Sequence, residues 1–590
     1  MPMALCQFAL LPNTTLLKNK NIPSLSRKKS SRVPCDIQCK ASSIITSDQN
    51  NTSSLSANFF QPSIWPYDYI QSLSSDFKEK SYAEEIDRLK DEVRVMLSNL
   101  ENPMNQLELI DILQRLGVDR YFGLEINNII ESVYKKSKDT LKTNNNLYAT
   151  ALEFRLLKQH GYDVSSDVFK GFLDDKGNFH SDLSVDIMGM LSLYEASFLS
   201  MEGEIILDEA RNFSSTYLKE FVHENKEDNE ISLLINHALE IPLHWRIKRL
   251  EARWFIDVYE RRQNMSPALL KLAKLDFNIL QAKYQEDLKH ASRWWKRLGL
   301  EEKFSFLRDR MVESFVWTVA FAEEPQFGYY RRMTAKVNAV VTFIDDIYDT
   351  YGELEELEVF TQIVDRWDID AIDSLPEYMK ICFLALYNFV NEVAFDVLKE
   401  KGHNTIPYLK KVWADLCKTY LVEAKWHRNG YKPSLHEYLE NGWISIGGPA
   451  ILVHAYVVLS NSSLLDSVSL DEYYDIIRSS SIVFRLVNDL GTSEREKETG
   501  DILKSVDWYI NETGASEADA RGHINWLISE TWKKMNKEAT TSPEFKSFID
   551  VALNIGRMSF CMYQYGDAHS IQNLETKNNI MSLLFQPIIV

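Results

Sequence analysis

Hydrophobic residues recur at steps of three and four along most of the chain, which is the spacing of an amphipathic helix. The stretch 82–97, YAEEIDRLKDEVRVML, places apolar side chains in this way at Ile86, Leu89, Val93, Met96 and Leu97. The pattern returns in the stretches 105–117, 147–161 and 268–299, which all end in glycine, as helices commonly do. Alternating strand patterns are hard to find, so we expect an all-α fold.

The charged stretch YERRQNMSP at 259–267 separates two helical patterns and marks the expected domain boundary. A chain of 590 residues exceeds the length at which single cores stop growing, so two domains are expected after any targeting segment. We therefore predict a lead at 1–52, a helical domain at 53–262 and a second helical domain at 263–590.

The N-terminal lead differs in chemistry from the rest of the chain. Residues 1–47 are rich in Ser, Thr, Lys and Arg and contain a single acid, Asp36. This composition is typical of an organelle transit peptide, although a disordered basic tail would look the same. Three of the six cysteines lie here, and the scatter of Cys382, Cys417 and Cys561 fits a reducing compartment without zinc-ligand spacing.

The longest apolar run, WISIGGPAILVHAYVVLS at 443–460, is interrupted by Gly447, Gly448 and Pro449. We interpret it as a broken core helix and expect no membrane span. The formal net charge of −19 argues against a nucleic-acid partner, because phosphate binding needs a concentrated basic surface.

The stretch FIDDIYDTYGE at 343–353 places three acids among apolar residues. On a helix Asp345 and Asp349 would share one face, with Asp346 to the side, because successive residues turn by about 100°. Two carboxylates one turn apart repel each other unless a cation lies between them. Taken alone, this D-D-x-x-D pattern fits a solvated surface equally well.

A second stretch, RLVNDLGTSEREKETGD at 485–501, changes this balance. Asn488, Thr492 and Glu496 follow one another at intervals of four, so a helix would line one face with their oxygen atoms. Oxygen ligands suit Mg²⁺, which often shares its shell with substrate phosphates. Arg485 projects from roughly the same side, and a guanidinium binds phosphate oxygens in pairs. The two stretches together therefore predict a site for magnesium and phosphate.

Several stretches give the chain a family resemblance. It resembles plant class I terpene synthases in DDIYD, NDLGTSERE, the RDR at 308–310, SDVFKGFLDDKGNF, GMLSLYEASFLS, LPEYMKICFLALYN and YQYGDAHS. The likeness runs from about Asn58 to Gln586 and is greatest to the angiosperm branch that contains plastidial monoterpene synthases. It implies an N-terminal α-barrel domain of no known catalytic role and a C-terminal class I α-helical domain. The central cavity of that domain is expected to hold three Mg²⁺ ions and a prenyl diphosphate.

The resemblance also implies roles for individual residues. The expected metal ligands are Asp345, Asp346, Asp349, Asn488, Thr492 and Glu496. The expected diphosphate contacts are Arg308, Arg310 and Arg485, with Asp345, Asp349 and Asn488 also at the substrate. Mg²⁺ is the expected cofactor, and Mn²⁺ is expected to substitute for it.

The reaction implied by the resemblance is that of a monoterpene synthase. The enzyme would ionise geranyl diphosphate, release diphosphate and end the carbocation by proton loss or water capture. We expect it in the plastid stroma after removal of the transit peptide, as a monomer or weak homodimer.

Aromatic residues are candidates for the wall around the cation. Trp317 lies seven residues after Arg310 on the same helical face, where its ring would attract a cation by roughly 0.5–2 kcal/mol. A core tryptophan would show the same spacing. The resemblance places Tyr565 and Asp567 near the mouth of the cavity, where they would help to close it or accept a proton. It also matches the ISIGGP break at 444–449 to a kinked helix whose carbonyls face the cation.

Other functions stay open. A chain-elongating prenyltransferase also binds diphosphate through metals but usually has two aspartate-rich motifs, and the second motif here is N-D-L-x-T-x-x-x-E. A helical scaffold with solvated acids would need no metal. Within the family, the alternatives are a sesquiterpene synthase acting on farnesyl diphosphate and a cyclic monoterpene synthase. Val316 argues against an isoprene synthase, which tends to have a second phenylalanine there.

One feature departs from the family pattern. Cyclising monoterpene synthases of this branch usually have an arginine pair eight residues ahead of a tryptophan, here matched by Trp65. Leu55 and Ser56 occupy the positions of the pair, or Ser54 and Leu55 if one insertion is allowed. The pair is thought to help hold the N-terminal strand over the active site during isomerisation of the trans double bond. A less closed site admits water more easily, so we expect mainly acyclic products such as linalool, ocimene or myrcene.

Overall fold

The computed structural model describes residues 62–139, 146–225, 229–462, 465, 470–499, 503–541, 545–566 and 573–590, with the side chains of 137–139, 493–499 and 541 left out. Among these residues the chain is helical nearly throughout and has no strand, only two isolated bridges, which confirms the all-α prediction. The predicted lead at 1–52 lies outside the described residues.

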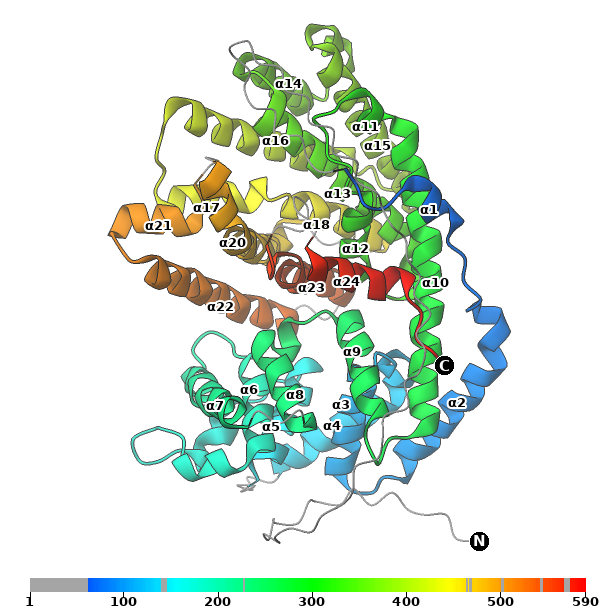
Figure 1. Ribbon diagram of the computed structural model, residues 1–590, viewed down its shortest axis with the longest axis vertical. Coiled ribbons are helices and arrows are strands. Elements are labelled where there is room, and N and C mark those ends of the chain that lie inside the picture. Colours follow the sequence, from blue (N-terminus) through cyan, green and yellow to red (C-terminus); the bar gives the residue numbers. More distant parts are fainter. Residues whose placement is uncertain are drawn as a thin grey trace, which may run out of the picture. The chain divides into compact units, whose positions relative to one another are not determined.

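The first part of the described chain is a stack of short helices (Figure 1). They are α1 (Tyr67–Ser72), α2 (Glu79–Asn99), α3 (Pro103–Arg115), α4 (Gly123–Asp139), α5 (Leu147–Gln159), α6 (Ile187–Ser197), α7 (Ile205–Glu224), α8 (Glu230–Glu240) and α9 (Lys248–Glu260). In α2 the predicted apolar face is confirmed, since Ile86, Leu89, Val93 and Leu97 are all buried. An asparagine side chain caps the first turn of α3, α5 and α8, which satisfies backbone N–H groups there.

The long helix α10 (Pro267–Leu298) packs against both parts of the chain. Ser266 caps its first turn, Pro267 occupies the first helical position, and Gly299 ends it in the left-handed conformation at φ 63°. It contacts α2 and α9 as well as two helices of the second part, α12 and α13 (Figure 1). Residues 60–590 form one compact unit, and the boundary between 262 and 263 stays a prediction.

The second part contains longer helices. They are α11 (Leu300–Lys303), α12 (Met311–Phe321), α13 (Gly328–Asp346), α14 (Leu354–Arg366), α15 (Glu377–Lys401), α16 (Ile406–Asn429), α17 (Leu435–Ser445), α18 (Gly448–Leu459), α20 (Tyr474–Thr499), α21 (Ser505–Thr513), α22 (Glu517–Thr541), α23 (Lys546–Tyr563) and α24 (Leu574–Ile580). Contacts run in a closed circuit from α12 through α13, α18, α16, α17, α20 and α23 back to α12. The two acidic stretches belong to α13 and α20, which are both members of this ring.

Two apolar segments have the length and composition of membrane spans. In α15 the most apolar window has a mean hydropathy of 1.5, and 44% of it is buried against the rest of the protein. The other segment is the pair α17 and α18, which is bent by 41°. Its break at Gly447, where φ is 82°, confirms the predicted interruption, and both helices pack into the ring. We therefore interpret α17 and α18 as core helices, and α15 as a helix that packs on α13 and α16.

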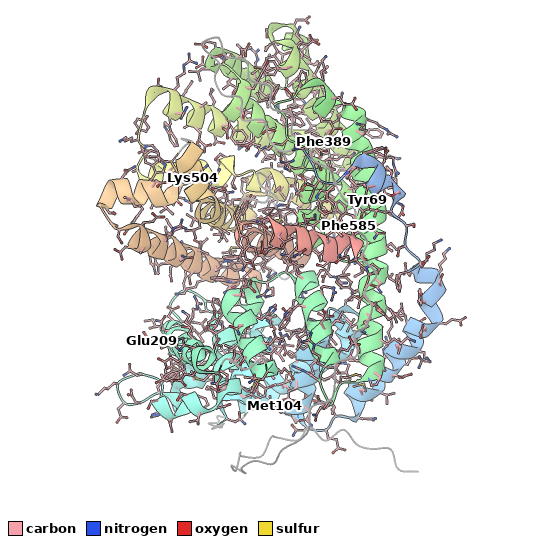
Figure 2. All side chains as sticks on the ribbon, viewed as in Figure 1. Tyr69, Met104, Glu209, Phe389, Lys504 and Phe585 are labelled. Carbon is pink, nitrogen blue, oxygen red and sulfur yellow. The ribbon has the colours of Figure 1, made fainter. Side chains whose placement is uncertain are left out.

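Two sets of aromatic contacts tie the first part of the chain to the second. Trp245 belongs to the short helix η4 (Leu243–Trp245). Its ring centroid lies 5.0 Å from that of Phe560 of α23, on which it stacks, and 5.5 Å from that of Trp532 of α22. Trp65 and Tyr69 contact Phe585 near the C-terminus, at 5.1 and 5.6 Å between ring centroids. Figure 2 shows Tyr69 and Phe585. The chain ahead of α1 is thereby fixed against the end of the chain.

Candidate active site

The first acidic stretch lies where α13 ends. The sequence predicts a regular helix through Asp349, but α13 stops at Asp346 and residues Ile347–Tyr351 form a π-helix. Single π-turns are rare and occur often at functional sites. The wider turn changes the local geometry, yet Asp345 and Asp349 still interact electrostatically, as their predicted spacing implies.

Arg308 joins two acids of this stretch. Its Nη2 is 2.6 Å from Asp345 Oδ2, and its Nε is 2.6 Å from Asp346 Oδ1. The backbone N–H of Arg308 also donates to Asp346 Oδ2 at 2.8 Å. Burial raises the pKa of Asp346 to about 6, and the contacts with Arg308 oppose that rise. Asp346 therefore orients Arg308 through both its guanidinium and its backbone N–H, and Asp345 contacts the same guanidinium.

Asp349 has an excess of negative charge around it. Its side chain is exposed to solvent, and the charged groups around its carboxyl include two other carboxylates. Desolvation, followed by repulsion from Asp345 and Glu423, raises the pKa of its carboxyl well above the usual range. Lys504 and Arg308 oppose the rise without cancelling it. A cation beside Asp349 would relieve this repulsion.

The second acidic stretch lies on α20. Asn488 is half-buried, and Thr492 is buried with its Oγ1 lacking a hydrogen-bond partner among the described residues. The backbone of Glu496 belongs to the same helix, which gives the three residues the predicted spacing, but its side chain lies outside the described residues. A buried hydroxyl without a partner is an available oxygen donor.

Arg485 lies on α20 one turn before Asn488. It is 6% exposed, and its Nε donates to the carbonyl oxygen of Gly442 at 3.1 Å while its Nη2 donates to Ser445 Oγ at 3.0 Å. Its Nη1 is 3.6 Å from Asp489 Oδ1. Asp489 in turn accepts hydrogen bonds from Tyr438 and from the backbone N–H of Ser505. Arg485 is thus held by α17 and α20 together.

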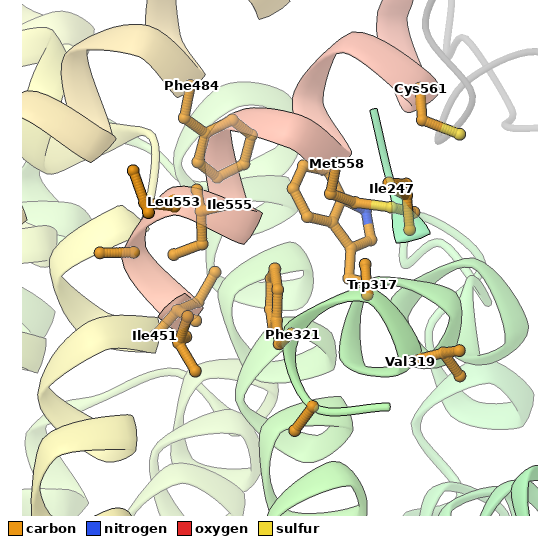
Figure 3. Close-up of a cluster of buried hydrophobic side chains, with 14 of the residues drawn as sticks. Ile247, Trp317, Val319, Phe321, Ile451, Phe484, Leu553, Ile555, Met558 and Cys561 are labelled. Atoms are coloured by element: carbon orange, nitrogen blue, oxygen red, sulfur yellow. The ribbon is translucent and has the colours of Figure 1, made fainter. Parts of the chain in front are cut away.

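Trp317 belongs to a buried aromatic cluster in the ring of helices. Its ring lies 4.8 Å from Phe484, 5.9 Å from Phe321 and 6.3 Å from Tyr563, so the cluster joins α12, α20 and α23. Figure 3 shows Trp317, Phe321 and Phe484 within one group of buried apolar side chains that also includes Met558. Phe484 immediately precedes Arg485, so the cluster and the arginine share helix α20.

The structure gives contacts for two of the remaining predicted residues, Arg310 and Tyr565. Arg310 is 2% exposed, and its Nη1 donates to the carbonyl oxygen of Asp309 at 2.8 Å. Tyr565 is 43% exposed, and its hydroxyl donates to Glu240 of α8 at 2.6 Å. The predicted role of Asp567 falls on a residue outside the described chain.

Sequence reasoning missed three residues that face the acids, namely Lys504, Glu423 and Tyr420. Lys504 precedes α21 and acts on the carboxyl of Asp349. Burial and the nearby carboxylates of Asp345, Asp349 and Glu423 raise the pKa of Tyr420 well above its usual range. For Tyr420 and Glu423, the sequence feature that could have indicated them is the stretch TYLVEAKW in α16, where a single acid interrupts an apolar and aromatic pattern.

The donors present fit a divalent metal with oxygen preference. Asp345 and Asp349 supply carboxylates, and Asn488 and Thr492 supply an amide and an unpartnered hydroxyl. Across the part of the chain that the structure describes, no group of three His, Cys, Asp or Glu side chains is arranged to hold a metal without other donors. In proteins Mg²⁺ keeps several waters and is commonly bound by one or two carboxylates together with substrate phosphates.

Comparisons with known proteins agree with this chemistry. Residues 296–534 match the family model "Terpene synthase family, metal binding domain", and residues 64–239 match "Terpene synthase, N-terminal domain". A chloroplastic myrcene synthase of Quercus ilex is 56% identical over 537 residues, which cover 90% of this chain and 89% of that protein.

Solved structures give the same result. A limonene synthase with 2-fluorolinalyl diphosphate has a TM-score of 0.87 and 46% identity, over 90% of this chain and 99% of that chain. An isoprene synthase from grey poplar leaves, in complex with three Mg²⁺ ions and dimethylallyl-S-thiolodiphosphate, has a TM-score of 0.81 and 45% identity. It is matched over 89% of this chain and 99% of that chain.

Proposed function

Because the chain belongs to the terpene synthase family, we propose that it is a monoterpene synthase that ionises geranyl diphosphate and releases diphosphate. It is a lyase, and its cofactor is a divalent metal. The observation that best supports the substrate class is the pairing of two fixed arginines, Arg308 and Arg485, with a group of acids whose charge is in excess around Asp349.

We propose Mg²⁺ as the metal, with three ions at the site and Mn²⁺ able to substitute. Asp345 and Asp349 on one side, and Asn488, Thr492 and Glu496 on the other, would hold the ions, as the raised pKa of Asp349 and the unpartnered Thr492 hydroxyl suggest. When bound, the metal neutralises the charge that develops on the leaving diphosphate.

The arginines have a separate role in the reaction. Arg308 is aligned by Asp346, and Arg485 by Gly442 and Ser445, so both guanidinium groups are oriented before substrate arrives. Preorganised donors stabilise developing charge without reorganising during the reaction. Arg308 and Arg485 would therefore bind the diphosphate oxygens and keep the released anion away from the carbocation.

The hydrocarbon part of the substrate needs a different environment. The cluster of Trp317, Phe321, Phe484 and Tyr563 brings together aromatic rings from α12, α20 and α23, and such rings attract a cation by roughly 0.5–2 kcal/mol each. The same rings exclude water from the wall they form. We propose that this cluster borders the allylic cation and that Trp317 contributes its face.

We propose that the products are mainly acyclic, such as linalool, ocimene or myrcene. The arginine pair is replaced by Leu55 and Ser56, while Trp65 is retained and donates its indole N–H to Glu313 of α12 at 3.0 Å. The N-terminal segment is thus fixed at Trp65 but lacks the charged residues ahead of it. Cyclic monoterpenes, and sesquiterpenes from farnesyl diphosphate, are the alternatives.

The enzyme is plastidial, in keeping with the basic N-terminal lead and with a relative named chloroplastic. We propose that it works in the stroma as a monomer or weak homodimer after removal of its transit peptide. A fluorescent fusion of residues 1–58 should enter plastids, and fluorescence in the cytosol would instead favour farnesyl diphosphate as substrate.

The product assignment is tested by gas chromatography. The chain truncated near Leu55 is incubated with Mg²⁺ and, separately, with the C5, C10 and C15 diphosphates. We expect geranyl diphosphate to be consumed fastest and to yield acyclic compounds. A profile dominated by limonene, pinene or cineole would contradict the acyclic assignment, and preference for farnesyl diphosphate would contradict the monoterpene assignment.

A further inference from the structure

A buried chain of hydrogen bonds lies behind Arg485. Arg485 Nη2 donates to Ser445 Oγ at 3.0 Å, and Ser445 Oγ donates to Glu423 Oε1 at 2.6 Å. Asn441 Nδ2 donates to the same oxygen of Glu423 at 2.9 Å. All four residues are at most 9% exposed, so water competes little for these bonds. The chain connects three helices of the ring, α16, α17 and α20.

The chain meets α17 where that helix ends. The last carbonyl groups of a helix have a partial negative charge that favours a cation nearby. The carbonyl oxygen of Gly442 accepts from Arg485 Nε there, and a Cβ atom at Gly442 would lie 3.4 Å from Arg485 Cγ and Nε. Arg485 therefore lies in van der Waals contact with the end of α17 at Gly442.

The arrangement restricts the guanidinium of Arg485. A free arginine side chain has several rotatable bonds, and ordering it when substrate binds costs free energy. Here Nε is fixed by Gly442, and Nη2 is fixed by Ser445, whose own hydroxyl is oriented by Glu423. A neutral hydroxyl that donates to a carboxylate becomes a better acceptor for a cation, because hydrogen bonds in series polarise one another.

We propose that Glu423 is a positioning residue, which through Ser445 fixes the plane of the Arg485 guanidinium before diphosphate binds. The inference rests on the proposed role of Arg485 in diphosphate binding. Asn441 supports the carboxylate from the second side, so that Glu423 keeps its orientation when Arg485 contacts the substrate. The residue acts without touching the substrate. Besides its repulsion of Asp349, its effect on diphosphate binding is transmitted through Arg485.

A double-mutant cycle tests this connection. Glu423→Gln keeps the shape of the side chain and removes its charge, and Ser445→Ala interrupts the chain without removing a charge. Each is expected to lower kcat/KM for geranyl diphosphate by roughly 10- to 100-fold, the range for a hydrogen bond to a charged group. In an Arg485→Lys background, Glu423→Gln should cost less than about threefold, because its effect needs the guanidinium. Equal losses in both backgrounds would overturn the proposal.

A control separates positioning from general packing in α16. Thr419 lies one turn before Glu423 and is 8% exposed; its hydroxyl donates to the carbonyl oxygen of Leu416, and its backbone carbonyl accepts from Asn441 Nδ2 at 3.2 Å. Thr419→Val therefore alters a buried hydroxyl on the same helix and keeps the backbone contact with Asn441. Its kcat/KM should stay within about twofold of the wild type. A loss as large as that of Ser445→Ala would show that any change in this region suffices, and would contradict the specific role of Glu423.

Two further measurements cover the remaining explanations. If Glu423 were itself a metal ligand, excess Mg²⁺ would restore the activity of Glu423→Gln, and this result would overturn the positioning role. Calorimetric titration with inorganic diphosphate and Mg²⁺ does not depend on turnover of any prenyl substrate. Weaker binding in Ser445→Ala than in Thr419→Val would support the inference even if geranyl diphosphate proved not to be the substrate, and equal binding would overturn it.

Discussion

Buried acids have opposite environments in the two parts of this protein. Between α3 and α9, Glu251 is 3% exposed and contacts Arg115 at 2.8 Å and His237 at 2.6 Å. Burial opposes its ionisation, but Arg115 and His237 outweigh burial and lower the pKa of Glu251 to about 2. At the end of α13, burial instead raises the pKa of Asp346 to about 6. The first acid is fully compensated by protein cations, and the second is not.

The difference separates charges that stabilise the fold from charges that are available for function. Asp276 repeats the compensated arrangement, since it accepts from Tyr121 and pairs with Arg120 and Arg249. Around Asp349 the neighbouring groups include two other carboxylates, and their repulsion is tolerated within the fold. Paired charges hold helices together, whereas uncompensated charges are available to bind cations from solution.

The largest expected effect comes from removing an uncompensated acid. Asp349→Ala should lower turnover by roughly 10³-fold or more, because a metal that stabilises the leaving group contributes several kcal/mol to the transition state. The melting temperature should stay equal or rise, since repulsion from Asp345 and Glu423 is relieved. Diphosphate release at saturating Mg²⁺ and thermal unfolding measure the two effects.

Asp370→Ala is the matched control for that variant. Asp370 is an exposed acid on a short helix after α14, and it should be replaceable without loss of turnover. Near wild-type activity in Asp349→Ala would refute the metal assignment.

The second effect comes from removing a compensated acid. Glu251→Gln leaves the buried Arg115 without its carboxylate and should lower the free energy of unfolding by about 3 kcal/mol, the order found when one partner of a buried ion pair is removed. Activity per folded molecule should be unchanged. Urea unfolding followed by circular dichroism gives the first quantity. The exposed pair Arg253 and Asp257 provides the control, since Asp257→Asn should cost less than about 1 kcal/mol.

The same acid makes stability depend on pH in a definite direction. The folded pKa of Glu251, about 2, lies below its ordinary value of 4.5, so the unfolded chain binds the proton more tightly. Its contribution is therefore complete above pH 4.5 and is lost as the pH falls towards 2. In Glu251→Gln this part of the acid destabilisation should be missing, and an unchanged pH profile would contradict the pairing.

The smallest expected effect concerns the contact between the N-terminal segment and α12. Trp65→Phe keeps a ring against Phe585 but removes the donor to Glu313, which lies one helical turn before Trp317. We expect a loss of turnover of roughly tenfold, the order for a hydrogen bond to a buried charge, and a higher ratio of alcohol to hydrocarbon products. Tyr69→Phe, which retains the other ring on Phe585, is the control. An unchanged product ratio in Trp65→Phe would show that the contact between Trp65 and Glu313 does not help to keep water away from the cation.

Much of the fold follows from local sequence patterns. The buried face of α2, the end of α10 at Gly299 and the break before Gly448 are each set by a few neighbouring residues, and they were predictable for that reason. The π-turn at Ile347–Tyr351 was not, because no residue type in this stretch distinguishes i→i+5 from i→i+4 hydrogen bonds. The same residues can form either a regular α-helix or a π-helix.

The residues of the candidate site were likewise predictable only in part. The spacing of Asp345 and Asp349, and of Asn488 and Thr492, is visible within single helices. Glu423 and Ser445 reach Arg485 only after three helices are packed together, and no residue spacing along the chain indicates that contact. Sequence reasoning therefore identified the groups that we propose to meet the substrate better than the groups that we propose to orient them.

The stacking of Trp245 on Phe560 bears on attempts to recombine enzymes of this kind. Helix α23 has Phe560 against Trp245 and, three residues later, Tyr563 beside Trp317. A chimera that joins the first part of this chain to the second part of a relative would exchange one partner of that stack and keep the other. We expect such hybrids to fold best when residues 243–245 and α23 come from the same parent. An exchange of the first part of the chain would then leave the surroundings of Trp317, and with them the set of terpene products, unchanged.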